Sequence, residues 1–254
     1  MFVFIFVIQE YAQNSQLLKG WLFCFNIKST RIKMAKKEHY YTQFESERFY
    51  HIYNRTIDKG KLFTNEGNYA FFLKKYDEYL SGFLDTYAYC LLGNHFHLLV
   101  KVLPESTVRE NLQKFESFNS AKILAQKTIS KEKTIHDIIS HQLKKFFQSY
   151  SMAYNKQQDR IGTLFQKPFK RALVDNEKYF TNMVYYIHAN PQKHGIVSDF
   201  REYQWSSFKR ILIEKPSKLK KSEVLEWFGN REHYLHFHNI NNGFNFPENW
   251  NLDE

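Results

Sequence analysis

The tripeptide His95-Phe96-His97 is the first part of the sequence that could do chemistry. Alternate side chains of a strand share a face, so a strand would present His95 and His97 together, about 7 Å apart along the chain. Side-chain rotamers can close that separation onto one metal ion. The alternative interpretation is a pair of surface or interstrand histidines. The opposite face of the strand is uniformly apolar and is expected to face the core: Phe96, Leu98, Val100 and Val102.

The same tripeptide recurs at His236-Phe237-His238. Its surroundings show no alternating apolar face, and His233 and His236 stand at helical spacing. The tripeptide alone is therefore weak evidence, and only the strand context makes the first copy a candidate site.

Tyr186 and Asn190 form a second candidate pair, within the run Tyr185–Pro191. In a helix these two residues lie within about 40° of each other, at the flank of an apolar stripe. A hydroxyl and an amide oxygen would then stand one turn apart at the rim of the buried face. The alternative is a rim tyrosine followed by an Asn-Pro pair that ends the helix.

The elements that would carry these residues alternate between strand and helix patterns. The helix that contains Tyr186 is expected to be capped by Asp175 and ended by Asn190-Pro191. A strand, a helix and a hairpin in this order are typical of the beginning of an α+β sandwich fold. Strands are expected over 48–55, 85–92 and 95–103, a strand or extended loop over 162–174, helices over 68–80, 136–155 and 204–212, and a helix-containing insertion over 104–133.

Composition limits the class of protein. A chain of 254 residues with 43% hydrophobic and 18% aromatic residues can form a core, which excludes disorder as the main state. The net charge of +10 favours an anionic partner such as nucleic acid or a membrane. Cys24 and Cys90 cannot build a disulfide framework or a zinc ribbon, so a reducing, cytoplasmic location is expected.

Taken together, the motifs resemble those of the single-tyrosine HUH transposases, in particular the REP-associated tyrosine transposases. The resemblance covers about residues 45–213, although Gly93 stands where many relatives have proline. Its four motifs occur in the family's order: Asn94-His95-Phe96-His97, Gly162-Thr163-Leu164-Phe165-Gln166 with Lys167, Lys170 and Arg171 after it, Tyr186-Ile187-His188-Ala189-Asn190-Pro191, and Trp205-Ser206-Ser207.

The resemblance implies a ferredoxin-like α+β fold, with an antiparallel sheet, a helical insertion and a C-terminal tail. It also implies that Tyr186 attacks a phosphodiester of single-stranded DNA, leaving a 5′-phosphotyrosine and a free 3′-OH, as in DNA transposition. Mg²⁺ or Mn²⁺ would be held by His95, His97 and Asn190. Because a phenol of pKa near 10 is a weak nucleophile at neutral pH, such an ion would assist the attack.

Contacts with DNA are expected from the segment between the two motifs. Lys167, Lys170 and Arg171 would pair with phosphates, and Phe165 would stack on unpaired bases. The alternative is a solvated basic face with phenylalanines in the core. Tyr150, on the earlier helix, is the alternative nucleophile, but Tyr186 is preferred because Asn190 follows it by one turn.

The chain is divided into three parts. Residues 1–40 are expected to be a poorly ordered extension, since 1–33 lack periodicity and Met34 opens a segment that resembles an ordinary start. The apolar stretch Met1–Ile8 is far shorter than the roughly 20 residues of a membrane span. Residues 41–213 are expected to form the transposase-like catalytic domain, and 214–254 a basic, then aromatic tail.

Two other functions are compatible with the same residues. One is a domesticated protein that recognises hairpin DNA or RNA without cutting it, and the other is a metal-dependent nuclease that forms no adduct. The expected partner is single-stranded or hairpin DNA and not a membrane, with the protein acting as a monomer or homodimer.

Overall fold

The fold is built on an antiparallel sheet with the strand order β2-β3-β1-β4. The computed structural model describes residues 42–120 and 133–241, and the expected extension over 1–40 lies outside them. The strands are β1 (Phe49–Arg55), β2 (Leu84–Leu91), β3 (His95–Val102) and β4 (Lys170–Val174).

Helices connect and cover these strands. The chain order β1-α3-β2-β3-α5-β4, with α4 inserted before α5, is that of a ferredoxin-like sandwich, and the predicted α+β fold class is confirmed. The described helices are α3 (Glu66–Leu80), α4 (Glu105–Ser120), α5 (Ile135–Gln157), α6 (Glu177–Lys193), the short 3₁₀ turn η2 (Phe200–Glu202), α7 (Phe208–Leu212), α8 (Lys221–Trp227) and α9 (Arg231–Ile240). None of them is long and apolar enough to cross a bilayer.

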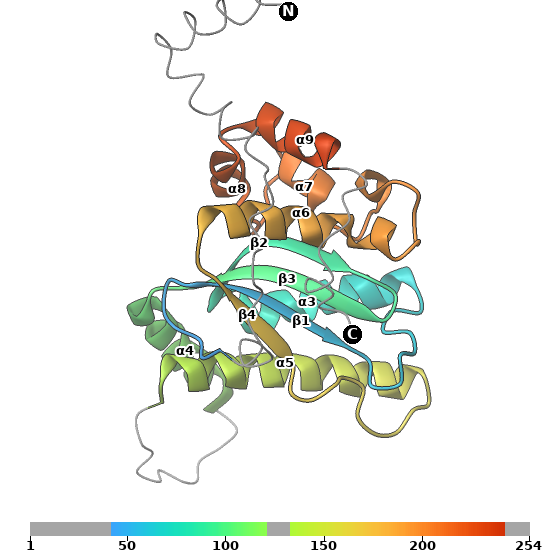
Figure 1. Cartoon of the computed structure of the whole chain (residues 1–254). Helices are drawn as coiled ribbons and strands as arrows, with labels where there is room; N and C mark the ends of the chain where they lie inside the picture. The colour runs from blue at the N-terminus through green and yellow to red at the C-terminus, as the bar shows by residue number, and fades with distance from the viewer. Residues whose placement is uncertain (1–41, 121–132, 242–254) are drawn as a thin grey trace, which may run out of the picture. The chain divides into compact units, whose positions relative to one another are not determined.

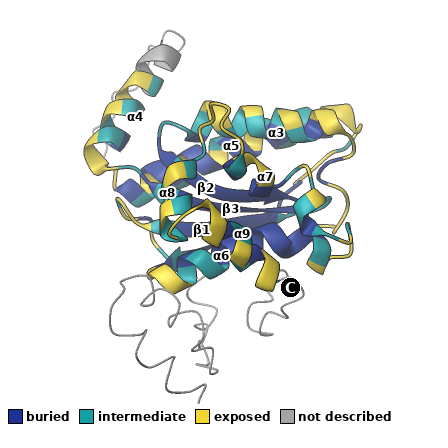
Figure 2. Cartoon of the chain, turned by 90° about the horizontal axis from the view of Figure 1, so that it is seen from above, coloured by how far each residue is buried: buried dark blue, intermediate teal, exposed yellow. Residues whose placement is uncertain are grey.

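The two faces of the sheet are covered by different helices. Helices α3 and α5 lie on one face and α6 lies on the other, with α7, α8 and α9 on the outer side of α6 (Figure 1). Phe72 of α3 packs on Phe96 of β3 and on Phe146 of α5, so the apolar face predicted for β3 lies in the core. The central strands are buried on both faces (Figure 2).

Strand alternation decides which residues face α6. On β3 the core face is apolar, and His95 and His97 point to the opposite face, as the sequence predicts. On β1 the core face holds Tyr50 and Ile52, while His51 contacts the ring of Tyr186 on α6. The α6 face of the sheet therefore collects the polar side chains of β1 and β3.

The boundaries of α6 differ from those predicted. Asn176, not Asp175, is the N-cap, and its side chain accepts a hydrogen bond from the backbone N–H of Tyr179 (2.9 Å). The helix also continues through Pro191 to Lys193. A proline removes one helical N–H donor, a loss that the last turn tolerates here, since the N–H of the C-cap residue still donates to the carbonyl of Asn190.

The described part of the C-terminal tail packs on the rest of the chain. Leu219 bridges to Thr86 of β2, and the Trp227 ring stacks on Phe180 of α6 with centroids 4.4 Å apart. Residues 214–241 thus lie in the same compact unit as the sheet.

Candidate active site

His95 and His97 form the sheet side of the site. Their rings lie 5.2 Å apart between centroids and are nearly perpendicular, and both side chains are buried. This placement follows from the alternation of β3, which puts both imidazoles beneath α6.

Tyr186 forms the helix side of the site. Its ring meets the His97 ring edge to face, with centroids 5.7 Å apart, and it is fully buried. Helix α6 lies across this face of the sheet (Figure 1). The structure therefore brings together the two motifs that lie about ninety residues apart in the sequence.

Asn190 stands one helical turn after Tyr186. Its side-chain Nδ2 donates a hydrogen bond to the Tyr186 carbonyl (2.8 Å), which fixes the amide group on α6. Its Oδ1 is buried and has no hydrogen-bond partner among the described residues. Buried amide oxygens without a partner are rare, and an amide oxygen is a ligand that a divalent cation accepts.

Asn94 determines which nitrogen of His95 carries the proton. The Nδ1 atom of His95 lies 2.6 Å from Asn94 Oδ1. An amide oxygen only accepts, so His95 donates from Nδ1 and keeps the lone pair of Nε2. A neutral imidazole with that lone pair is a metal ligand.

His51 on β1 is a third buried imidazole that the sequence analysis missed. Its Nε2 lies 3.0 Å from His97 Nδ1, and the two rings are nearly parallel, with an interplanar angle of 15°. The Tyr53 ring is nearly parallel to both, with centroids 4.9 Å from His51 and 5.8 Å from His97. A signal was present, because His51 and Tyr53 alternate on β1 as His95 and His97 do on β3.

The solvent side of the site is formed by the end of α6. The Lys193 Nζ atom lies over the Tyr186 ring, 5.1 Å from its centroid, and the His194 ring lies 4.9 Å from that of His95. Both side chains are exposed. The sequence analysis missed them because it ended the helix at Asn190-Pro191.

The residues present fit a divalent cation with open coordination positions. Two neutral imidazoles and one amide oxygen are donors that Mn²⁺ accepts and that leave room for phosphate oxygens. Among the described residues, no group of three His, Cys, Asp or Glu side chains could hold a metal ion. The Asn190 oxygen is the further protein donor that the sequence predicts for such an ion.

Comparison with known proteins gives one curated relative and one solved structure. A Haemophilus influenzae protein provisionally named a REP-associated tyrosine transposase is 28% identical over 148 residues, which are 58% of this chain and 68% of the relative. The resemblance to the REP-associated tyrosine transposases is confirmed. The solved structure, a REP-associated tyrosine transposase bound to a REP hairpin, covers 69% of this chain and 86% of its own, at 15% identity and a TM-score of 0.46. No family model matches the sequence.

Tyr150, the alternative nucleophile, lies on the wrong face of the sheet for this transposase-like site. Its ring packs against Phe72 in the core between α3 and α5, and its hydroxyl donates to the Leu62 carbonyl (2.7 Å). Burial raises the pKa of the Tyr150 phenol above its usual range. The structure therefore places Tyr150 apart from the imidazoles, which are on the opposite face.

Arg171 does not join Lys167 and Lys170 in one basic surface. Its guanidinium lies over the rings of Phe44 and Phe169, 5.0 and 5.3 Å from their centroids, and its Nε donates to the backbone of residue 42. The side chain is nearly buried, at 7% exposure. Adjacent residues of β4 face opposite sides, so the predicted phosphate contact of Arg171 is incompatible with its position.

Phe165 likewise belongs to the core. It is 4% exposed, and its ring packs against Phe96 and Phe147. A ring held in this way has no free face for a base, so the predicted stacking role is incompatible with its burial.

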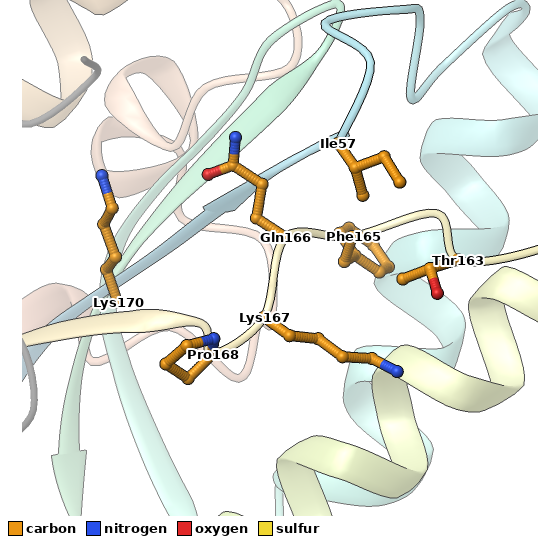
Figure 3. A pocket seen from close by; sticks show the side chains of 7 residues that line it. All are labelled: Ile57, Thr163, Phe165, Gln166, Lys167, Pro168 and Lys170. Carbon is orange, nitrogen blue, oxygen red and sulfur yellow. The ribbon is translucent and has the colours of Figure 1, made fainter.

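A surface pocket remains beside β4. Figure 3 shows the exposed Lys167 and the half-buried Lys170 extending away from each other on opposite sides of Pro168. The Lys170 Nζ lies 5.5 Å from the centroid of Tyr53, whose ring is 5.8 Å from that of His97. This pocket thus adjoins the candidate active site: its lining residues are Ile57, Thr163, Phe165, Gln166, Lys167, Pro168 and Lys170.

His188, whose role the sequence left open, is buried on the other side of α6. Its Nε2 lies 2.7 Å from Ser207 Oγ, and its Nδ1 lies 3.0 Å from His238 Nε2. Burial holds the pKa of His188 well below its usual range and lowers that of His238 to about 3. The second His-Phe-His copy therefore contributes a structural histidine that joins α9 to the tyrosine helix.

Proposed function

We propose that this protein is a metal-dependent transferase of single-stranded DNA that works through a 5′-phosphotyrosine on Tyr186. The observation that carries the proposal is the contact between the Tyr186 ring and His97, in a site that also contains His95 and Asn190. The relationship to a curated tyrosine transposase supports the same chemistry.

In the proposed reaction the Tyr186 oxygen forms a bond to phosphorus, and the bond from phosphorus to the 3′-oxygen breaks. The phenol proton leaves to solvent, and the 3′-oxygen takes up a proton to become the free 3′-OH. The phosphodiester is replaced by a phosphotyrosine diester, so no nucleotide cofactor is needed for rejoining. A divalent cation held by His95, His97 and Asn190 would neutralise charge on the scissile phosphate.

The chain's own residues arrange these groups before substrate arrives. Asn94 leaves the Nε2 lone pair of His95 available for a cation. The hydrogen bond from Asn190 to the Tyr186 carbonyl sets the amide oxygen one turn from the nucleophile. Fixed donors of this kind need little reorganisation during the reaction, which lowers its barrier.

The proposed substrate is single-stranded or hairpin DNA, the partner class that the motifs indicate. The net charge of +10 favours a polyanion. Lys167 and Lys170 would pair with backbone phosphates in the pocket beside Tyr53, close to the site of attack.

The test is incubation of the purified protein with 3′-end-labelled hairpin DNA and Mn²⁺, followed by a denaturing gel. Wild-type protein is expected to retain label on the protein band, whereas Tyr186→Phe keeps the ring contact and loses the adduct. Tyr203→Phe is a matched control, because the Tyr203 hydroxyl donates to the Leu91 carbonyl of β2 (2.7 Å) and not to a group of the candidate site. Binding without any adduct in wild-type protein would instead support the non-catalytic function.

A further inference from the structure

His51 and His97 form a fully buried imidazole pair whose role is not explained by the ligand set. Their hydrogen bond, His51 Nε2 to His97 Nδ1 at 3.0 Å, lies inside the fold where both residues have zero exposure. We propose that His51 fixes the tautomer of His97, so that His97 presents the Nε2 lone pair to the cation. This inference rests on the proposed function.

One proton is shared by the two facing nitrogens, and its location decides what His97 can do. If His51 Nε2 carries it, neutral His97 must be protonated on Nε2 and presents no lone pair there. If His97 Nδ1 carries it, His51 accepts and the His97 Nε2 lone pair is available. Only the second arrangement makes His97 a ligand.

His95 provides an internal parallel. The Asn94 amide oxygen accepts from His95 Nδ1 at 2.6 Å, and an amide oxygen allows only that direction. His51 stands in the same relation to Nδ1 of His97. The two imidazoles of β3 would thus be prepared in the same way by different acceptors, one preceding β3 and one on β1. Such outer partners typically change metal affinity by about 10–100-fold.

The surroundings of His51 hold it in this position. Its ring lies nearly parallel to those of His97 and Tyr53, at an interplanar angle of 15° to each, and the Tyr53 ring also lies 5.8 Å from that of His97. In the register of the sheet Tyr53 pairs with His97 and His51 pairs with Leu99, so His51 reaches His97 diagonally. Its Nε2 is directed at His97, which makes it a positioning residue and not a third ligand.

The first measurement is the tautomer itself, by long-range ¹H–¹⁵N correlation NMR of the metal-free protein. His97 is expected to carry its proton on Nδ1 in wild-type protein and in His51→Gln, whose amide oxygen can accept. In His51→Phe the Nε2-protonated form is expected to appear. A wild-type His97 protonated on Nε2 would overturn the inference, and this result needs no variant to fold.

The second measurement is Mn²⁺ affinity, followed by electron paramagnetic resonance. His51→Phe is expected to bind Mn²⁺ about 10–100-fold more weakly, and His51→Gln is expected to stay close to wild type. Ile52→Val, on the core face of β1, is the control for destabilisation of the strand. Unchanged affinity in His51→Phe overturns the role of His51 alone. If wild-type protein binds Mn²⁺ no more tightly than His97→Ala does, the proposed metal site is contradicted. The inference about His51 then fails with it.

Discussion

Acidification should weaken the attachment of α9 to the tyrosine helix, because His188 and His238 are buried as neutral imidazoles. Their pKa values in the folded protein are lowered, that of His238 to about 3, while the unfolded chain titrates near 6.5. The unfolded state therefore binds more protons below pH 6.5, and stability falls as the pH falls through that value. When the pH falls from 7 to 5.5, each histidine should lower the free energy of unfolding by about 1.2 kcal/mol, and the pair by about 2.5 kcal/mol.

The assay is urea denaturation followed by circular dichroism at both pH values. Wild-type protein should lose about 2.5 kcal/mol of unfolding free energy on acidification, beyond what other groups contribute. His238→Gln removes one titrating imidazole, so its loss should be smaller by about 1.2 kcal/mol. Equal losses in wild type and His238→Gln would refute the argument that these histidines are buried neutral.

Three further predictions concern the segment around β4 and the metal ligands. Lys170→Ala should weaken binding of single-stranded DNA and reduce the slope of log affinity against log salt by about 0.7, measured by fluorescence anisotropy; an unchanged slope would exclude its phosphate contact. Arg171→Ala should leave that slope unchanged and lower the unfolding free energy by about 1–3 kcal/mol, and weaker DNA binding without destabilisation would contradict its burial. Asn190→Leu should weaken Mn²⁺ binding in a calorimetric titration while the protein stays folded, and unaltered affinity would remove the amide oxygen from the ligand set.

The core side of β3 and the fold class could be predicted from the sequence because their patterns are unambiguous. Phe96, Leu98 and Val100 occupy alternate positions of β3, with His97 and Leu99 between them, and a single register buries them. The motif spacing on α6 likewise predicts that Tyr186 and Asn190 share one side of a helix.

Other features could not be predicted because both sides of the sheet are buried. The aromatic residues of β1 occupy two covered faces, so the alternation of His51 and Tyr53 shows that they share a face but not which face that is. The burial of Arg171 could not be predicted for the same reason. Its charge is typical of an exposed residue, but here the rings of Phe44 and Phe169 cover the guanidinium. Lys193 was missed because Pro191 is normally a stop signal, and here it lies within the last turn.

The central claim is that the hydroxyl oxygen of Tyr186 is the nucleophile, beside the paired histidines. The most direct test is to trap the protein on hairpin DNA with Mn²⁺, digest both components, and identify the nucleotide-bearing peptide by tandem mass spectrometry. The account predicts a phosphodiester on Tyr186 alone. A nucleotide on Tyr150 or on any other tyrosine would contradict it.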